Sequence, residues 1–66
     1  MTTKFQTEFI TDALKDVAGM AITKLETQKS NVPFLRESQD LERTGKCRWP
    51  VLNQLRIWLT EAGETP

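Results

Sequence analysis

The chain has 66 residues, with nine basic and nine acidic side chains, and this length predicts one small domain over residues 1–66. It has no histidine and a single cysteine, Cys47, so we expect no internal disulfide, no metal and no other cofactor. This balanced charge lacks the basic excess that is typical of nucleic-acid-binding proteins. No apolar run approaches the roughly 18 residues of a membrane span, and the first residues lack the apolar core of a signal peptide, so we expect a cytoplasmic protein with no membrane partner.

The first half of the chain predicts helix. Residues 1–6 show no periodic pattern, and we expect a loose end there. From residue 9 to residue 25, apolar side chains recur at the three- and four-residue steps of a helical stripe. Gly19 interrupts this stretch, either as the residue that makes a turn or as a small residue at a close helix contact. If Gly19 makes a turn, we expect two helices, over about residues 10–18 and 21–29. If Gly19 lies at a close helix contact, we expect one helix, over about residues 8–28.

The middle of the chain predicts a hairpin. A turn-rich stretch that ends at Pro33 stops the preceding helix. The short segments 34–36 and 46–49 have the character of strands, the second because polar and apolar residues alternate along it. We therefore expect a short hairpin over about 34–49 with a polar tip, and we expect Cys47 to face the interior as a small hydrophobic residue.

The last predicted element is the best defined. Pro50 suits the first turn of a helix, where the missing N–H of proline is no loss. Apolar residues follow one face of the segment 51–62, and Gly63 is a natural end for this helix. Trp49 and Trp58 both border apolar positions, so we expect both tryptophans in the core of so small a domain.

The segment Leu14–Leu25 resembles a helix-turn-helix, in which a helix ends at a glycine, here Gly19, and an apolar residue follows six positions later. The segments Val32–Arg36 and Gly45–Leu59 are similar to the rest of phage winged-helix DNA-binding domains, including those of small terminase subunits and the excisionase group. These domains share a Pro-containing step into a wing hairpin and a closing helix marked by an aromatic residue near the position of Trp58. The resemblance implies a mostly α fold, a small winged helix-turn-helix, that binds duplex DNA.

The winged-helix resemblance implies two groups of DNA contacts. Polar side chains of the second helix can bond base edges in the major groove, and its lysines can pair with phosphates. Long cationic side chains on a projecting hairpin can reach the phosphate backbone. The helix group is Thr23, Lys24, Thr27, Gln28 and Lys29, and the hairpin group is Arg36, Arg43, Lys46 and Arg48. The alternative interpretation is a solvated helix face and ordinary surface charge that nearby acidic residues balance.

Two functions are consistent with these patterns. The chain has no histidine, no glycine-rich phosphate loop and no metal-ligand spacing, so we expect that it is not an enzyme. The first function is that of a small phage- or prophage-type protein that binds duplex DNA, with an excisionase-like, packaging or regulatory role, and that acts as a dimer or in a cooperative array.

The second function is that of a helical interaction module that binds itself or a host protein without contacting DNA. It requires one continuous first helix, against which the segment 50–62 packs. The apolar residues that this packing leaves exposed are Phe5, Phe9, Met20 and Ile22. Neutral net charge favours the interaction module, whereas the order of the elements favours DNA binding, and DNA binding is the function that we predict.

Overall fold

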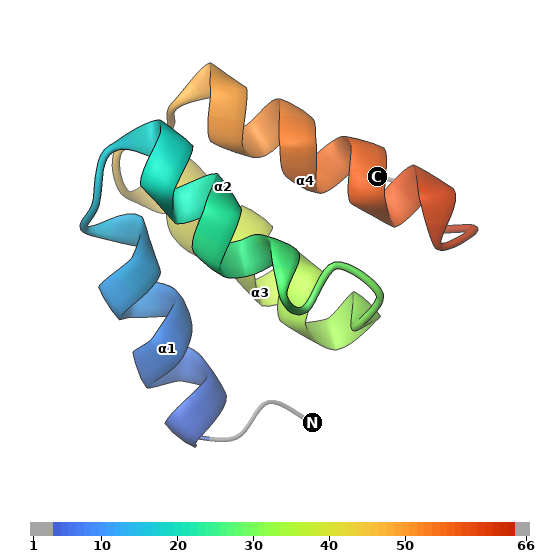
Figure 1. Ribbon diagram of the computed structural model, residues 1–66, viewed down its shortest axis with the longest axis horizontal. Helices are drawn as coiled ribbons and strands as arrows, with labels where there is room; N and C mark the ends of the chain where they lie inside the picture. Colours follow the sequence, from blue (N-terminus) through green and yellow to red (C-terminus); the bar gives the residue numbers. More distant parts are fainter. Residues whose placement is uncertain (1–3, 65–66) are drawn as a thin grey trace.

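A computed structural model describes residues 4–64, and this part of the chain folds into four helices without a strand (Figure 1). The helices are α1 (Lys4–Leu14), α2 (Ala18–Glu26), α3 (Val32–Thr44) and α4 (Trp49–Glu61). The prediction of a small, mostly helical protein is therefore confirmed, but the described residues contain no wing. None of the four helices is long and apolar enough to cross a membrane.

The helices form a ring around one core, and neighbours in the sequence are not always neighbours in space. α1 packs against α2 and α3, and α4 packs against the same two helices. α2 and α3 therefore lie across the core from each other, and Figure 1 shows α2 in front of α3 with α1 and α4 on opposite sides. All four helices contribute buried apolar side chains to this core, namely Ile10, Ala13, Leu14, Ala21, Leu25, Phe34, Leu35, Val51, Leu55, Trp58 and Leu59.

The break between the first two helices lies at residues 15–17, before Gly19. Val17 precedes α2 with extended backbone angles (φ −61°, ψ 156°), and the amide of Asp16 donates to the carbonyl of Ala13 (3.2 Å). Gly19 lies inside α2, and a Cβ atom built on it meets no atom within 4 Å. Two helices are present, as the first interpretation required, but Gly19 makes neither the turn nor a close helix contact.

Both helices of the first half begin and end earlier in the chain than predicted. α1 already includes residues 4–6, which were expected to be a loose end, whereas residues 1–3 lie outside the described part. The turn at residues 15–17 depends on contacts with distant residues, described below, so the local pattern did not reveal it. The helix expected over about 21–29 stops at Glu26, and residues 27–30 form turns.

The predicted hairpin over 34–49 is wrong, because α3 occupies most of that segment. Pro33 lies in the first turn of α3, where a proline is well tolerated, so it begins a helix and does not lead into a strand. The buried side chains of α3 are spaced as on a helix, but two of them, Ser38 and Glu42, are polar. The Ser38 hydroxyl donates to the carbonyl of Phe34 (2.9 Å), which satisfies it inside the core. Because two of the four buried residues are polar, the apolar periodicity of this segment does not reveal the buried face of α3.

α4 confirms the predicted closing helix, with Pro50 in its first turn. Gly63 follows the helix with a φ of 84°, in the left-handed region that favours glycine. The Gly63 amide donates to the carbonyl of Thr60 (3.0 Å), and the Glu64 amide donates to the carbonyl of Leu59 (2.9 Å). These two bonds form the Schellman motif, which satisfies carbonyl groups at the end of a helix.

Of the two tryptophans predicted in the core, only Trp58 is buried. The Trp58 side chain is 5% exposed, whereas Trp49, in the first turn of α4, is 72% exposed. Cys47 was also predicted to face inward, but it is exposed in the connection between α3 and α4, with a φ of 51°. Its amide donates to the carbonyl of Glu42 (2.7 Å). The prediction for Cys47 assumed a strand, and a tight connection between two helices takes its place. The prediction for Trp49 assumed that so small a domain needs both tryptophans in its core, but the core is filled without Trp49.

Candidate functional site

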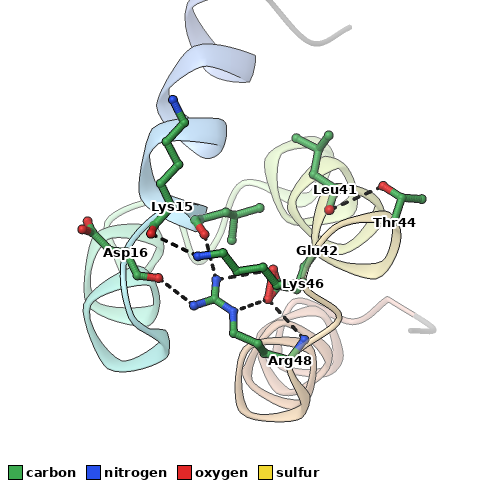
Figure 2. Close-up of polar contacts among 8 residues, drawn as sticks. Lys15, Asp16, Leu41, Glu42, Thr44, Lys46 and Arg48 are labelled. Atoms are coloured by element: carbon green, nitrogen blue, oxygen red, sulfur yellow. Dashed lines mark hydrogen bonds and ion pairs between the residues drawn. The ribbon is translucent and has the colours of Figure 1, made fainter.

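The densest set of polar contacts surrounds Arg48, which immediately precedes α4 (Figure 2). The Nε atom of Arg48 donates to Oε1 of Glu42 (2.6 Å), and the Arg48 backbone amide donates to the same oxygen (3.3 Å). The Glu42 side chain is 1% exposed and that of Arg48 is 19% exposed. A carboxylate this deeply buried requires a charged partner and hydrogen bonds, and Arg48 supplies both.

The same guanidinium group joins the connection before α4 to the end of α1. Its Nη1 atom donates to the carbonyl of Asp16 (2.6 Å), and its Nη2 atom donates to the carbonyl of Leu14 (3.0 Å). Carbonyl groups at the C-terminal end of a helix lack intrahelical partners, and a cation there is favourable. Nearby, Nζ of Lys46 donates to the carbonyl of Lys15 (3.1 Å), as Figure 2 shows. We refer to Glu42, Lys46 and Arg48 as the Arg48 cluster.

The Arg48 cluster changes the interpretation of two predicted phosphate contacts. Lys46 and Arg48 were expected to project on a hairpin, but the structure brings both onto the C-terminal end of α1. The guanidinium of Arg48 is committed to Glu42 and to backbone carbonyl groups. The cluster therefore holds the helices together, and these two residues do not stand on a projecting wing.

The predicted helix group lies near the end of α2 and in the turn that follows it. The Thr23 hydroxyl donates to the carbonyl of Gly19 (3.0 Å), and the Thr27 hydroxyl donates to the carbonyl of Lys24 (2.9 Å), so both threonines bond to their own chain segment. Nζ of Lys24 forms an ion pair with Asp16. The hydrogen bond to Asp16 is the main reason why the pKa of Lys24 lies above its ordinary value.

The last two members of the helix group, Gln28 and Lys29, line different hollows. Gln28 lies with Phe5, Phe9 and Phe34, whereas Lys29 lies beside Trp58. The helix group is therefore not one continuous surface that faces a single ligand.

The arginines, in contrast, gather on the surface that α3 and α4 share. The chain has four arginines, of which Arg48 belongs to the cluster described above. Arg36 and Arg43 lie on α3, and Arg56 lies on α4. Nη2 of Arg36 pairs with Oε1 of Glu64 (3.5 Å), just beyond α4, so Arg36 lies on the side of α3 that faces α4. We refer to Arg36, Arg43 and Arg56 as the arginine face.

Arg43 and Arg56 line one shallow hollow between α3 and α4. The other lining residues are Gln39, Trp49, Leu52 and Asn53, so no acidic side chain of the described residues lines it. Nη2 of Arg56 donates to Oδ1 of Asn53 (2.9 Å). Within residues 4–64, neither Arg43 nor Arg56 is paired with a carboxylate. This hollow therefore presents two uncompensated positive charges.

The volume of the hollow is about 270 Å³. Sites that enclose small molecules usually occupy about 300–1,000 Å³. This hollow is smaller and open, so it suits contact with part of a larger ligand better than enclosure of a small one.

Only part of this surface was predicted from the sequence. Arg36 and Arg43 were expected on a wing, whereas Gln39, Asn53 and Arg56 were not predicted. The signal for the first two is their spacing of seven residues, which puts both on one side of a helix. This signal becomes visible only once the segment is assigned to α3. Trp49 was placed in the core, so it was not considered as a surface contact.

No group of three acidic, cysteine or histidine side chains in the described residues is arranged to hold a metal ion. Comparisons of the chain with models of protein families, with curated proteins and with solved structures find no match. The function must therefore be argued from the residues of this chain.

Proposed function

We propose that the protein binds duplex DNA with the surface that α3 and α4 share, and that the arginine face makes the principal contacts. One observation carries this proposal: three of the four arginines lie on the surface that α3 and α4 share, and two of them have no carboxylate partner among the described residues. Uncompensated cations on an exposed helix favour a polyanionic partner.

The side chains on this surface have the chemistry that DNA contacts require. Arginine presents a planar set of donors that matches a phosphate or the edge of guanine, and glutamine can bond the edge of adenine. Arg36 and Arg43 are seven residues apart, which corresponds to about 10 Å along a helix, and Gln39 lies between them in the sequence. An α-helix fits into the major groove, which is about 12 Å wide.

Neutral net charge does not exclude this function, because charge is not evenly distributed over the molecule. Two exposed acidic residues, Glu8 and Asp12, belong to α1, which lies across the core from α4. The hollow between α3 and α4 has no acidic lining residue among those described. The lining of this hollow is therefore positive although the total charge is zero, whereas Asp40 of α3 and Glu64, which pairs with Arg36, lie outside that lining.

The proposal keeps the predicted function but moves the interface. The predicted reading helix covered about residues 21–29, and the predicted wing covered about 34–49. In the interface proposed now, α3 is the reading helix and Arg56 of α4 adds a phosphate contact. Arg36 and Arg43 belong to both versions of the interface.

The protein should bind a mixed-sequence DNA duplex with an affinity that depends steeply on salt. If the three arginines of the arginine face neutralise three phosphates, the slope of log K against log salt is about −3. The affinity then falls roughly 40-fold between about 50 and 200 mM salt. Fluorescence anisotropy with a labelled duplex at several salt concentrations measures this slope.

Substitutions separate the arginine face from charge elsewhere. The double variant R43A/R56A should reduce the slope to about −1, since each phosphate contact contributes about 0.9. K15A is the matched control, because Lys15 is an exposed cation at the end of α1 and its side chain is outside the arginine face. Equal salt slopes for the wild type and R43A/R56A would refute the proposed interface, and an absence of duplex binding at low salt would refute the function.

A second candidate function, self-association, has one specific observation in its favour. Phe5 is 78% exposed on α1, and it lines an apolar hollow of about 350 Å³ with Phe9 and Phe34. The rings of Phe9 and Phe34 lie 5.8 Å apart. The interaction module required one continuous first helix, and the structure has two helices there. Phe5, Phe9 and Met20 are exposed, as that hypothesis expected, whereas Ile22 is partly buried. A second copy of this chain that covers Phe5 and Phe9 would remove both side chains from water.

Self-association predicts that the sedimentation coefficient of the wild type rises with protein concentration and that F5S abolishes the rise. The apolar contact contributes most of the association free energy, because burying a phenylalanine side chain is worth about 1.5–3 kcal/mol. M20S is the matched control, since Met20 is an exposed apolar residue of α2 that does not line this hollow. A wild type that sediments as a monomer at every accessible concentration would exclude this candidate.

A further inference from the structure

The exposure of Trp49 is the feature that the proposed function does not use. Tryptophan is the largest side chain and is normally buried over most of its surface, so a tryptophan that is 72% exposed invites an explanation. Trp49 lies in the first turn of α4 and contributes to the wall of the hollow between α3 and α4. Its indole ring therefore offers an aromatic surface to a ligand in that hollow.

The other lining residues define the chemistry of such a ligand. Arg43 and Arg56 supply positive charge, and the amides Gln39 and Asn53 supply both donors and acceptors. The remaining lining residue, Leu52, is apolar. A ligand that satisfies this set has a flat aromatic part, hydrogen-bonding edges and nearby negative charges. A nucleotide within a nucleic acid chain has all three properties.

We propose that the hollow between α3 and α4 binds single-stranded nucleic acid, with an unpaired base stacked on Trp49 and the neighbouring phosphates on Arg43 and Arg56. This inference deepens the proposed function and rests on the arginine face that it uses. It goes beyond duplex binding, because in a duplex the faces of each base are covered by the adjacent bases. Stacking on an exposed aromatic side chain therefore selects bases that are unpaired.

An acidic peptide is the competing ligand, since it also supplies negative charge. A peptide of acidic residues without aromatic side chains offers no flat ring to Trp49 and leaves the exposed indole without a role. The tryptophan thus favours a nucleic acid over a peptide, and the experiment below treats the peptide as a separate outcome.

Intrinsic fluorescence tests the inference directly, because only one of the two tryptophans is exposed. Trp58 is buried in the core, so quenching by an added ligand reports on Trp49. We expect a short thymidine oligomer to quench the emission of the wild type but not that of W49F. We expect W49A to lower the affinity for this oligomer by about 5- to 150-fold, which corresponds to the loss of one stacked base. We expect R43A/R56A to weaken it as well.

Further probes separate stacking from charge. An abasic oligomer of equal length carries the same phosphates without bases, and a glutamate-rich peptide carries charge without phosphate or base. We expect both to bind more weakly than the thymidine oligomer and to leave Trp49 unquenched. Equal affinity of the abasic oligomer, or stronger binding of the peptide, would overturn the inference.

The DNA duplex used above distinguishes this inference from the proposed function. Binding of the duplex without quenching by the thymidine oligomer refutes the single-strand site and leaves the duplex proposal standing. Binding and quenching by the thymidine oligomer without binding of the duplex refutes the duplex proposal and leaves the single-strand site standing. If neither ligand binds at low salt, both proposals fail.

Discussion

Replacing Glu42 with alanine should lower the free energy of unfolding by about 3–5 kcal/mol. The substitution removes a carboxylate that is 1% exposed and leaves the partly buried guanidinium of Arg48 without a counter-charge. A domain of 66 residues has a total stability of roughly 3–10 kcal/mol. The expected loss is therefore at least about a third of the total stability and exceeds it at the low end of that range. Urea unfolding followed by circular dichroism measures this loss.

Two further variants show whether the loss comes from the Arg48 cluster. D40A is the matched control, because Asp40 is an exposed carboxylate on the same helix, and its removal should change stability by less than about 0.5 kcal/mol. R48K keeps the charge but lacks the planar set of donors that reaches Glu42 and two carbonyl groups at once, so it should recover only part of the stability. If E42A were as stable as the wild type, the buried pair of Glu42 and Arg48 would not stabilise the fold.

The difference between α4 and α3 shows which parts of the fold were predictable from the sequence. Each signal for α4 lies inside or beside the helix: Pro50 at its start, an apolar face along it and Gly63 at its end. The buried face of α3 includes Ser38 and Glu42. These two polar residues interrupt the apolar periodicity of the helix, although the Phe34 carbonyl and Arg48 satisfy them close by in the chain, so the segment was mistaken for a hairpin.

The candidate site could be predicted only in part, because residues far apart in the chain form it. Arg48 was recognised as a cation available for binding, but two of its acceptors are carbonyl groups 32 and 34 residues earlier in the chain. Only the tertiary structure brings them to Arg48. Arg36 and Arg43 were predicted as cations of a wing hairpin, and the structure places them on α3. Their relation to Trp49 and Arg56 required the packing of α3 against α4.

Replacing each tryptophan with alanine should give very different losses of stability. W58A should cost about 3–5 kcal/mol, because it removes a large side chain that is 5% exposed and leaves a cavity among core residues of the surrounding helices. W49A should change the free energy of unfolding by less than about 0.5 kcal/mol, since most of its side chain is already in water. Thermal and urea unfolding of the two variants under identical conditions provides the comparison.

This comparison decides between two arrangements of the segment 46–49. If it were a strand of a hairpin, as the alternating pattern suggested, Trp49 would face the core, and W49A would cost as much as W58A. If Trp49 instead begins α4, as the structure shows, W49A remains folded and is suitable for the binding experiments. A loss of affinity for single-stranded nucleic acid in a fully stable W49A variant is then the result expected if the indole contacts the ligand. Comparable losses of stability in both variants would contradict the position of Trp49 and remove the basis for the stacking site.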